Sequence, residues 1–202
     1  IMATVTVPAV GTASRRAKFS KALSAVAAEM ELAQQSAVAA STYAWVAFSA
    51  GTNQPLLVSA RSLEGRSPTN PVVDLTATNA IAIQIGRVQS LEGIVFSETL
   101  PNTSTYTNLP AGQAAASTPM QSALGLKARV PGTSEVRSFD WAVEFNPMGE
   151  ATVRTASGAF PVENVKLVAI PSAGATPGAS EQQQAALIWI NGLTGGVEVL
   201  QP

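Results

Sequence analysis

The 202-residue sequence contains no cysteine and no histidine. The lack of cysteine excludes disulfides, thiolate metal sites and cysteine nucleophiles. The lack of histidine removes the commonest general base and the commonest metal ligand. Aspartate is scarce as well, since only Asp74 and Asp140 occur, and the glutamates are scattered. We therefore predict no catalytic residues, no metal site and no cofactor.

Sequence motifs that mark common enzyme classes are also missing. There is no P-loop, no G-x-G-x-x-G fingerprint, no G-x-S-x-G elbow and no D-x-D-x-D calcium loop. A Ser-Lys pair or a pair of glutamates is not excluded by these absences, but no convergent set of titratable residues indicates one. We predict that the chain is not an enzyme.

Charge is low and nearly balanced. Charged residues make up 12% of the chain, and twelve basic residues face thirteen acidic ones. This is about half the usual charged share of ~25%. No bulk field therefore attracts the chain to nucleic acid or to an anionic membrane. With 46% apolar residues the chain can fold, and its neutral surface is typical of an assembly subunit or of a bland extracellular domain.

Residues 1–41 are predicted to form one long helix, and residues 42–202 a β-rich head. The first segment is rich in alanine and contains one proline and one glycine, which favours helix. Apolar residues recur every three or four positions within it, which places them on one stripe of a helix. This packing stripe consists of Phe19, Leu23, Val26, Met30 and Ala33.

Residues 1–10 carry no charge and are apolar on every face. Ten residues are too few to span a bilayer, which needs about 20. We expect them to be the end of a longer apolar helix that continues upstream of Ile1. Pro8 is expected to kink this helix, because proline lacks the backbone N–H and clashes with the preceding turn.

Four basic residues follow within seven positions, namely Arg15, Arg16, Lys18 and Lys21. In one interpretation they form a membrane-interface collar, whose long cationic side chains reach the lipid headgroups. In the other they are the solvated face of a soluble helix. The sequence supports both equally.

Alternating apolar residues predict strands in the rest of the chain. The strand from Thr42 to Ser49 is apolar on both faces and should be buried on both. The other predicted strands cover residues 55–60, 81–85, 139–145, 165–170, 185–190 and 195–200. Surface loops are predicted at 61–71, 99–119 and 171–184, and Asn102 begins a possible glycosylation sequon. The predicted fold class is α+β, with a long N-terminal helix packed on an antiparallel β-sheet head.

The order of these features resembles type IV pilins and pseudopilins: an apolar helix end, Pro8, a basic collar, a long amphipathic helix and a β-rich head. Two stretches resemble the FimT/GspH-type pseudopilins more closely. Residues 22–39, with Leu32-Ala33 and Ala37, are similar to that family's L-A-x-x-x-A helix exit. Near the C-terminus, Phe145, Pro147 and Gly149 resemble its F-x-P-x-G turn, and Thr194-Gly195 resembles the T-G turn of its closing hairpin.

The resemblance covers the first fifty and last sixty residues, roughly, and the middle of the chain matches no part of the pattern. The length and the ending Val-Leu-Gln-Pro resemble, more loosely, the pilin-like Verru_Chthon cassette protein D. The family's leader and its glutamate near the mature N-terminus have no counterpart in this sequence.

The resemblance implies a structural subunit, a pilin or minor pseudopilin, of a type IV pilus-like or type II secretion-like filament. Its partners would be other pilin or pseudopilin subunits, and the inner membrane through a segment expected before Ile1. It implies a place in the bacterial cell envelope, as an inner-membrane-anchored precursor and then as a periplasmic or extracellular filament.

A DNA-binding minor pilin of a DNA-uptake system is the alternative, because some relatives in this family take part in DNA uptake. DNA affinity requires clustered basic residues, whereas the closing strand carries Glu198 and the basic cluster lies in the collar. Binding of nucleic acid is therefore not expected. A role as an adhesin that uses the long loops is a third option, which no specific residue supports.

Overall fold

The computed structural model describes residues 6–49, 54–68, 72–97, 118–119, 121–155, 158–161, 164–172, 177 and 179–201. In these ranges the elements are α1 (Thr6–Ala39), β1 (Ala44–Phe48), β2 (Leu56–Ser62), β3 (Val72–Asp74), β4 (Ala82–Gln84), β5 (Gln89–Ser90), β6 (Ile94–Ser97), β7 (Thr118–Pro119), β8 (Gln121–Arg129), β9 (Val136–Phe145), β10 (Ala151–Thr155), β11 (Gly158–Pro161), β12 (Asn164–Pro171), α3 (Ala179–Gln182), β13 (Ala186–Asn191) and β14 (Val197–Leu200).

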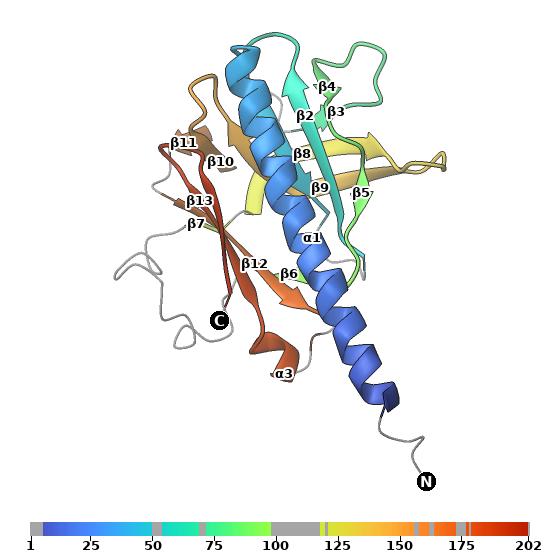
Figure 1. Cartoon of the computed structure of the whole chain (residues 1–202). Coiled ribbons are helices and arrows are strands. Elements are labelled where there is room, and N and C mark those ends of the chain that lie inside the picture. Colours follow the sequence, from blue (N-terminus) through green and yellow to red (C-terminus); the bar gives the residue numbers. More distant parts are fainter. Residues whose placement is uncertain are drawn as a thin grey trace.

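Helix α1 runs without interruption across Pro8 (Figure 1). The residues before Thr6 lie outside the described part of the chain. The predicted kink depends on the turn that precedes Pro8, so it stays a prediction. The helix ends with Ser41 in the left-handed region at φ 48°. The amides of Ser41 and Thr42 donate back to the carbonyls of Val38 and Ala37, at 3.2 and 3.0 Å, which is the Schellman arrangement.

The described strands form two sheets, and α1 contacts both. In the nine-stranded sheet the order is β11-β10-β9-β1-β2-β4, with β8 also on β9, β3 on β8 and β5 on β2. In the five-stranded sheet the order is β14-β13-β12-β6, with β7 on β12. Figure 1 shows α1 lying along the boundary between the two sheets.

The nine-stranded sheet curls into a small, nearly closed barrel. Its path from β3 through β8, β9, β1 and β2 to β4 encloses one apolar cluster, to which the two end strands contribute Val73 and Ala82. Strand β1 sends Trp45 and Ala47 into this interior and Val46 and Phe48 into the core under α1. Strand β1 is therefore buried on both faces, as its sequence predicts.

The main core lies between α1, the outer wall of the barrel and the five-stranded sheet. It joins the α1 stripe to the β1 and β9 side chains Val46, Phe48, Trp141, Val143 and Phe145, and to the β12 and β13 side chains Val165, Leu167, Ala169, Ala186, Ile188 and Ile190. One face of α1 thus stabilises two sheets at once by burying apolar surface against both.

The predicted α+β fold, a helix packed on an antiparallel sheet head, is wrong. The chain is mostly β, with 44% of it in strands, and the barrel sheet is mixed. Among the described strands, two pairs are parallel, β3 with β8 and β7 with β12. The pairing of β8 with β9 shifts register between Gln121 and Leu126, and such a shift bends a strand. Opposite this shift, Phe139 packs inside the barrel and Trp141 packs under α1.

All seven predicted strand segments overlap observed strands, but β3, β5, β6, β7, β8, β10 and β11 were not predicted. One of these missed strands and one short helix change the loop predictions. The short strand β7 lies inside the predicted loop 99–119, and helix α3 lies inside the predicted loop 171–184. The rest of loop 99–119, including the sequon at Asn102, lies outside the described residues.

Candidate functional site

The four collar residues lie where α1 leaves the β-domain. Every side chain from Ala13 to Lys18 is exposed, and Phe19 is the first buried residue after them. Figure 1 shows this end of α1 extending beyond both sheets. The part of the helix before Phe19 is about 20 Å long at 1.5 Å per residue. The helix therefore projects from the domain with its basic residues at the point of exit.

The packing stripe lies further along the same helix, in the main core. All five of its residues are buried, and three of them, Val26, Met30 and Ala33, have no exposed surface. The stripe begins one residue after the collar's Lys18. The first domain-bound turn of α1 therefore directly follows the projecting part.

Lys18 joins the collar to the domain. Its Nζ lies 3.0 Å from a carboxylate oxygen of Glu92, and both side chains are about half exposed. The hydrogen bond from Lys18, together with its positive charge, holds the pKa of Glu92 below its usual range. The adjacent Gly93 has a φ of 76°, and a Cβ there would approach Lys18 Cβ to 3.1 Å. Glycine thus lets the chain pass close to the helix at this pair.

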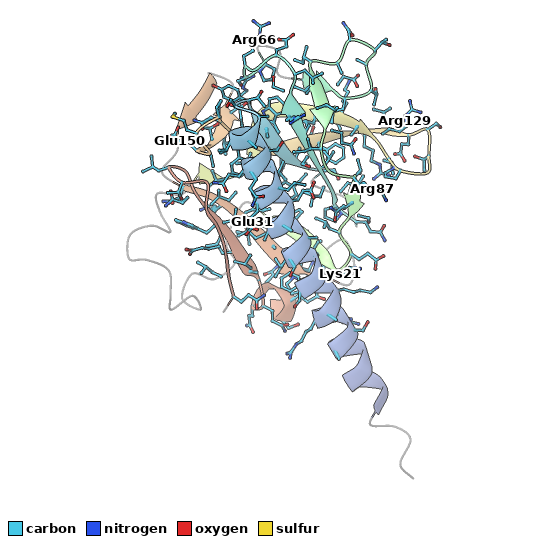
Figure 2. The ribbon with its side chains drawn as sticks, turned by 45° about the horizontal axis from the view of Figure 1, so that its top comes forward. Lys21, Glu31, Arg66, Arg87, Arg129 and Glu150 are labelled. Atoms are coloured by element: carbon cyan, nitrogen blue, oxygen red, sulfur yellow. The ribbon has the colours of Figure 1, made fainter. Side chains whose placement is uncertain are left out.

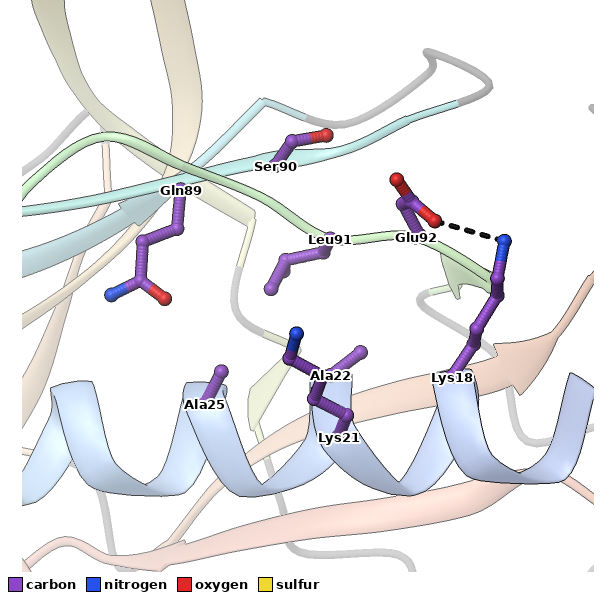
Figure 3. A pocket seen from close by; sticks show the side chains of 8 residues that line it. All are labelled: Lys18, Lys21, Ala22, Ala25, Gln89, Ser90, Leu91 and Glu92. Carbon is purple, nitrogen blue, oxygen red and sulfur yellow. Dashed lines mark ion pairs between the residues drawn. The ribbon is translucent and has the colours of Figure 1, made fainter. Parts of the chain in front are cut away.

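A hollow of about 270 Å³ lies beside this ion pair, between α1 and the segment from Gln89 to Glu92 (Figure 3). Ala22, Ala25 and Leu91 supply apolar lining, and Lys21 and Ser90 supply polar groups. The small alanine side chains leave this space open. A second hollow of about 420 Å³ lies between α1, Gln184 and Gln201, and is lined by Arg16. Lys18, Lys21 and Arg16 therefore line hollows of the domain surface.

Glu29 is a buried carboxylate on α1, only 5% exposed. It accepts a hydrogen bond from the Ser59 hydroxyl of β2, and Gln89 Nε2 donates to its other oxygen at 3.1 Å. A Cβ on Gly86 would overlap the carboxylate. Buried charges are costly unless they are hydrogen-bonded, so this contact fixes the rotation and axial position of α1 on the barrel.

The two turn motifs singled out in the sequence meet at the other end of α1. The side-chain amide of Gln34 donates to the carbonyl oxygens of Gly149 and Thr194, at 3.3 and 2.5 Å. Between the turns, Ala151 N donates to Gly192 O at 2.8 Å. A Cβ on Gly195 would overlap the Gly149 carbonyl. Residues more than 40 positions apart in the sequence thus form one junction.

Each turn is built around an asparagine and a left-handed glycine. Asn146 Oδ1 accepts from the amides of Met148 and Glu150, and Gly149 has a φ of 85°. In the second turn, Asn191 Oδ1 accepts hydrogen bonds from the amides of Leu193 and Thr194, and Gly195 has a φ of 65°. Asparagine side chains that bond the backbone ahead of them favour tight turns. Phe145 itself is fully buried in the main core.

A second buried carboxylate, Glu144, closes one region of the barrel. Trp45 Nε1 and Ser67 Oγ both donate to its Oε2, each at 2.7 Å. Arg154 donates to the Ser67 hydroxyl at 2.5 Å and to the Pro68 carbonyl. The cluster ties the segment after β2 to β1, β9 and β10. Because its contacts are all within the domain, we assign it a structural role.

Four residues that hold α1 in place were not predicted from the sequence, namely Glu29, Gln34, Gln89 and Glu92. One signal was present. Glu29 stands three residues after Val26 and four before Ala33, so it lies at the edge of the apolar stripe. A charged residue at such a position predicts a specific buried partner. Gln34 and Gln89 carry no comparable signal, because their partners are distant in the sequence.

In the described ranges, no three acidic side chains gather into a group that could hold a metal ion. The helices described here include none that is both long enough and apolar enough to cross a membrane. The absence of a cofactor and of catalysis remains a prediction.

Comparison with known proteins shows no match to a family model, to a curated protein or to a solved structure.

Proposed function

We propose that the chain is a structural subunit, a pilin or minor pseudopilin, of a type IV pilus-like or type II secretion-like filament. Its partners are other subunits of the same kind, and the N-terminal end of α1 is directed toward the inner membrane. The filament belongs to the bacterial cell envelope, in the periplasm or outside the cell.

The observation that supports this proposal best is the projecting part of α1. All its described side chains are exposed in the single chain, whereas helices of this length are normally stabilised by packing. The rest of α1 is anchored to the domain. Gln34 bonds to the turns at Gly149 and Thr194, and Glu29 bonds to Ser59. A helix held at one end and projecting at the other is suited to packing against helices of neighbouring subunits.

The test is assembly in the producing cells. We expect material sheared from the envelope to contain filaments labelled by an antibody against this chain in electron micrographs. Ala17→Trp should abolish them, because Ala17 is exposed on the projecting helix and a bulky side chain there prevents close helix packing. The matched control, Ser134→Trp, adds the same side chain at an exposed position of the β8–β9 hairpin and should leave the filaments intact. Absence of filaments from the unmodified chain would refute the proposal.

DNA binding is less well supported. All twelve basic residues are described, and three of them, Lys18, Arg66 and Arg137, pair with glutamates of the same chain. Glu198 is exposed on β14. A protein that neutralises several phosphates requires several clustered cations, so the filament is the better proposal.

A further inference from the structure

Helix α1 carries two exposed charges of opposite sign, Lys21 and Glu31 (Figure 2). Neither forms an ion pair with another described residue, although the charge of Lys21 also helps to lower the pKa of Glu92, the ion-pair partner of Lys18. Within a helix, charged side chains pair with residues three or four positions away. At those distances Lys21 has Ala17, Lys18, Ser24 and Ala25, and Glu31 has Ala27, Ala28, Gln34 and Gln35. Neither charge therefore meets an opposite charge on its own helix.

The two charges point to opposite flanks of the exposed face. Val26 is fully buried and lies five residues from each of them. At about 100° per residue, each charge points about 140° away from the core direction, one on either side. They are ten residues apart, or about 15 Å along the axis, so they cannot reach each other within one chain.

We propose that Lys21 of one copy pairs with Glu31 of the next copy, through parallel α1 helices offset by ten residues. This inference rests on the proposed filament function and names its contact. Because one flank of each helix meets the other flank of its neighbour, the contact is heterologous and repeats without closing. It predicts an axial offset of about 15 Å between these neighbours.

The shape of the helix fits this register. Val38 follows Glu31 by seven residues, and Ala28 follows Lys21 by seven, so the same offset places Val38 against Ala28. Val38 is 49% exposed in the single chain, and Ala28 is a small, exposed partner. On the Lys21 flank, the hollow lined by Ala22 and Ala25 leaves room for the approaching side chain (Figure 3).

The test is charge reversal in cells that assemble the filament. Lys21→Glu and Glu31→Lys should each lower the filament yield by at least about tenfold. The first places two glutamates, and the second two lysines, opposite each other in neighbouring copies. The double reversal should restore the yield. Arg129→Glu, an exposed reversal on the β8–β9 hairpin, is the control and should have no effect. The unfolding transition of each purified variant should match that of the unmodified chain.

A cysteine pair tests the register directly, because the chain contains no other cysteine. Lys21→Cys combined with Glu31→Cys should give a ladder of disulfide-linked oligomers on oxidation, and neither substitution alone should give one. The two cysteines are too far apart for a disulfide within one chain. If the charge reversals leave the filament yield unchanged and the cysteine pair gives no ladder, this contact is overturned while the proposed function stays intact. A closed, doubly linked dimer would indicate antiparallel helices and would overturn it as well.

Discussion

Gly86 lies directly against the buried carboxylate of Glu29, so that even a methyl group at position 86 would overlap it. The contact joins α1 to the barrel at a point where the helix has an acidic residue at the edge of its apolar stripe. Ser59 and Gln89 satisfy the two carboxylate oxygens, and Gly86 leaves the space they need. This arrangement sets the position of the helix on the barrel.

Gly86→Ala should lower the free energy of unfolding by about 2 kcal/mol, because displacing Glu29 breaks buried hydrogen bonds to a charged group. Urea denaturation of the purified chain measures the loss. Gly196→Ala is the control, since a Cβ there would meet only the Thr194 hydroxyl at 3.3 Å. Combining Gly86→Ala with Glu29→Ala should cost less than the sum of the two, because the second change removes the overlapping group. Simple additivity would contradict the contact.

Val26→Asp should unfold the domain or destabilise it by roughly 3–5 kcal/mol, because it places an unpaired charge in the core. Val26 has no exposed surface and packs between both sheets. Ser24→Asp, two residues away on the exposed face, should change stability by no more than about 0.5 kcal/mol. Thermal unfolding followed by circular dichroism compares them. Equal stability of the two variants would show that the stripe is not core.

Gln34→Ala should detach the two turns from the end of α1 without unfolding the barrel. It removes the hydrogen bonds to the carbonyls of Gly149 and Thr194, at a cost of about 1–3 kcal/mol. We expect faster amide exchange at Ala151 and Gly195, and little change at β2 amides. Gln35→Ala, at an exposed neighbouring position, serves as the control. Unchanged exchange at both turns would argue against the junction.

The ion pair of Lys18 with Glu92 should break as the pH falls. Lys18 lowers the pKa of Glu92. The pair therefore contributes to folding stability above the ordinary pKa of the carboxyl group, and this contribution is lost as the pH falls through the lowered pKa. A carboxyl NMR titration should show Glu92 titrating below the usual glutamate range. Lys18→Met should raise the pKa of Glu92 toward that range, with the charge of Lys21 still lowering it. A Glu92 pKa that is the same with and without Lys18 would mean that the pair does not form in solution.

The purified chain should not bind DNA appreciably at physiological salt, about 150 mM. Its basic residues are offset by acidic ones, and binding that relies on few phosphate contacts is weak and falls with salt. A gel-shift titration measures it. Micromolar binding that is lost when Arg15, Arg16, Lys18 and Lys21 are changed to Ala would instead favour a role in DNA uptake.

The sequence by itself determined the features that follow from local periodicity. The three- and four-residue spacing from Phe19 to Ala33 predicts a helix with one buried stripe, and the doubly apolar run at β1 predicts a strand buried on both faces. Asn146 and Gly149, and Asn191 and Gly195, lie within a few residues of each other, so they also mark turns from local chemistry alone.

Only the tertiary structure decided the barrel, the parallel pairs and the contacts that hold α1 in place. The expected antiparallel head failed because the pairing of β3 with β8 joins segments more than 50 residues apart, and short strands carry no local signal for their partners. Glu29 meets Ser59, and Gln34 meets Thr194, only where the folded sheets bring these distant residues together. A buried polar side chain depends on distant atoms for its hydrogen bonds, so its role is decided by packing.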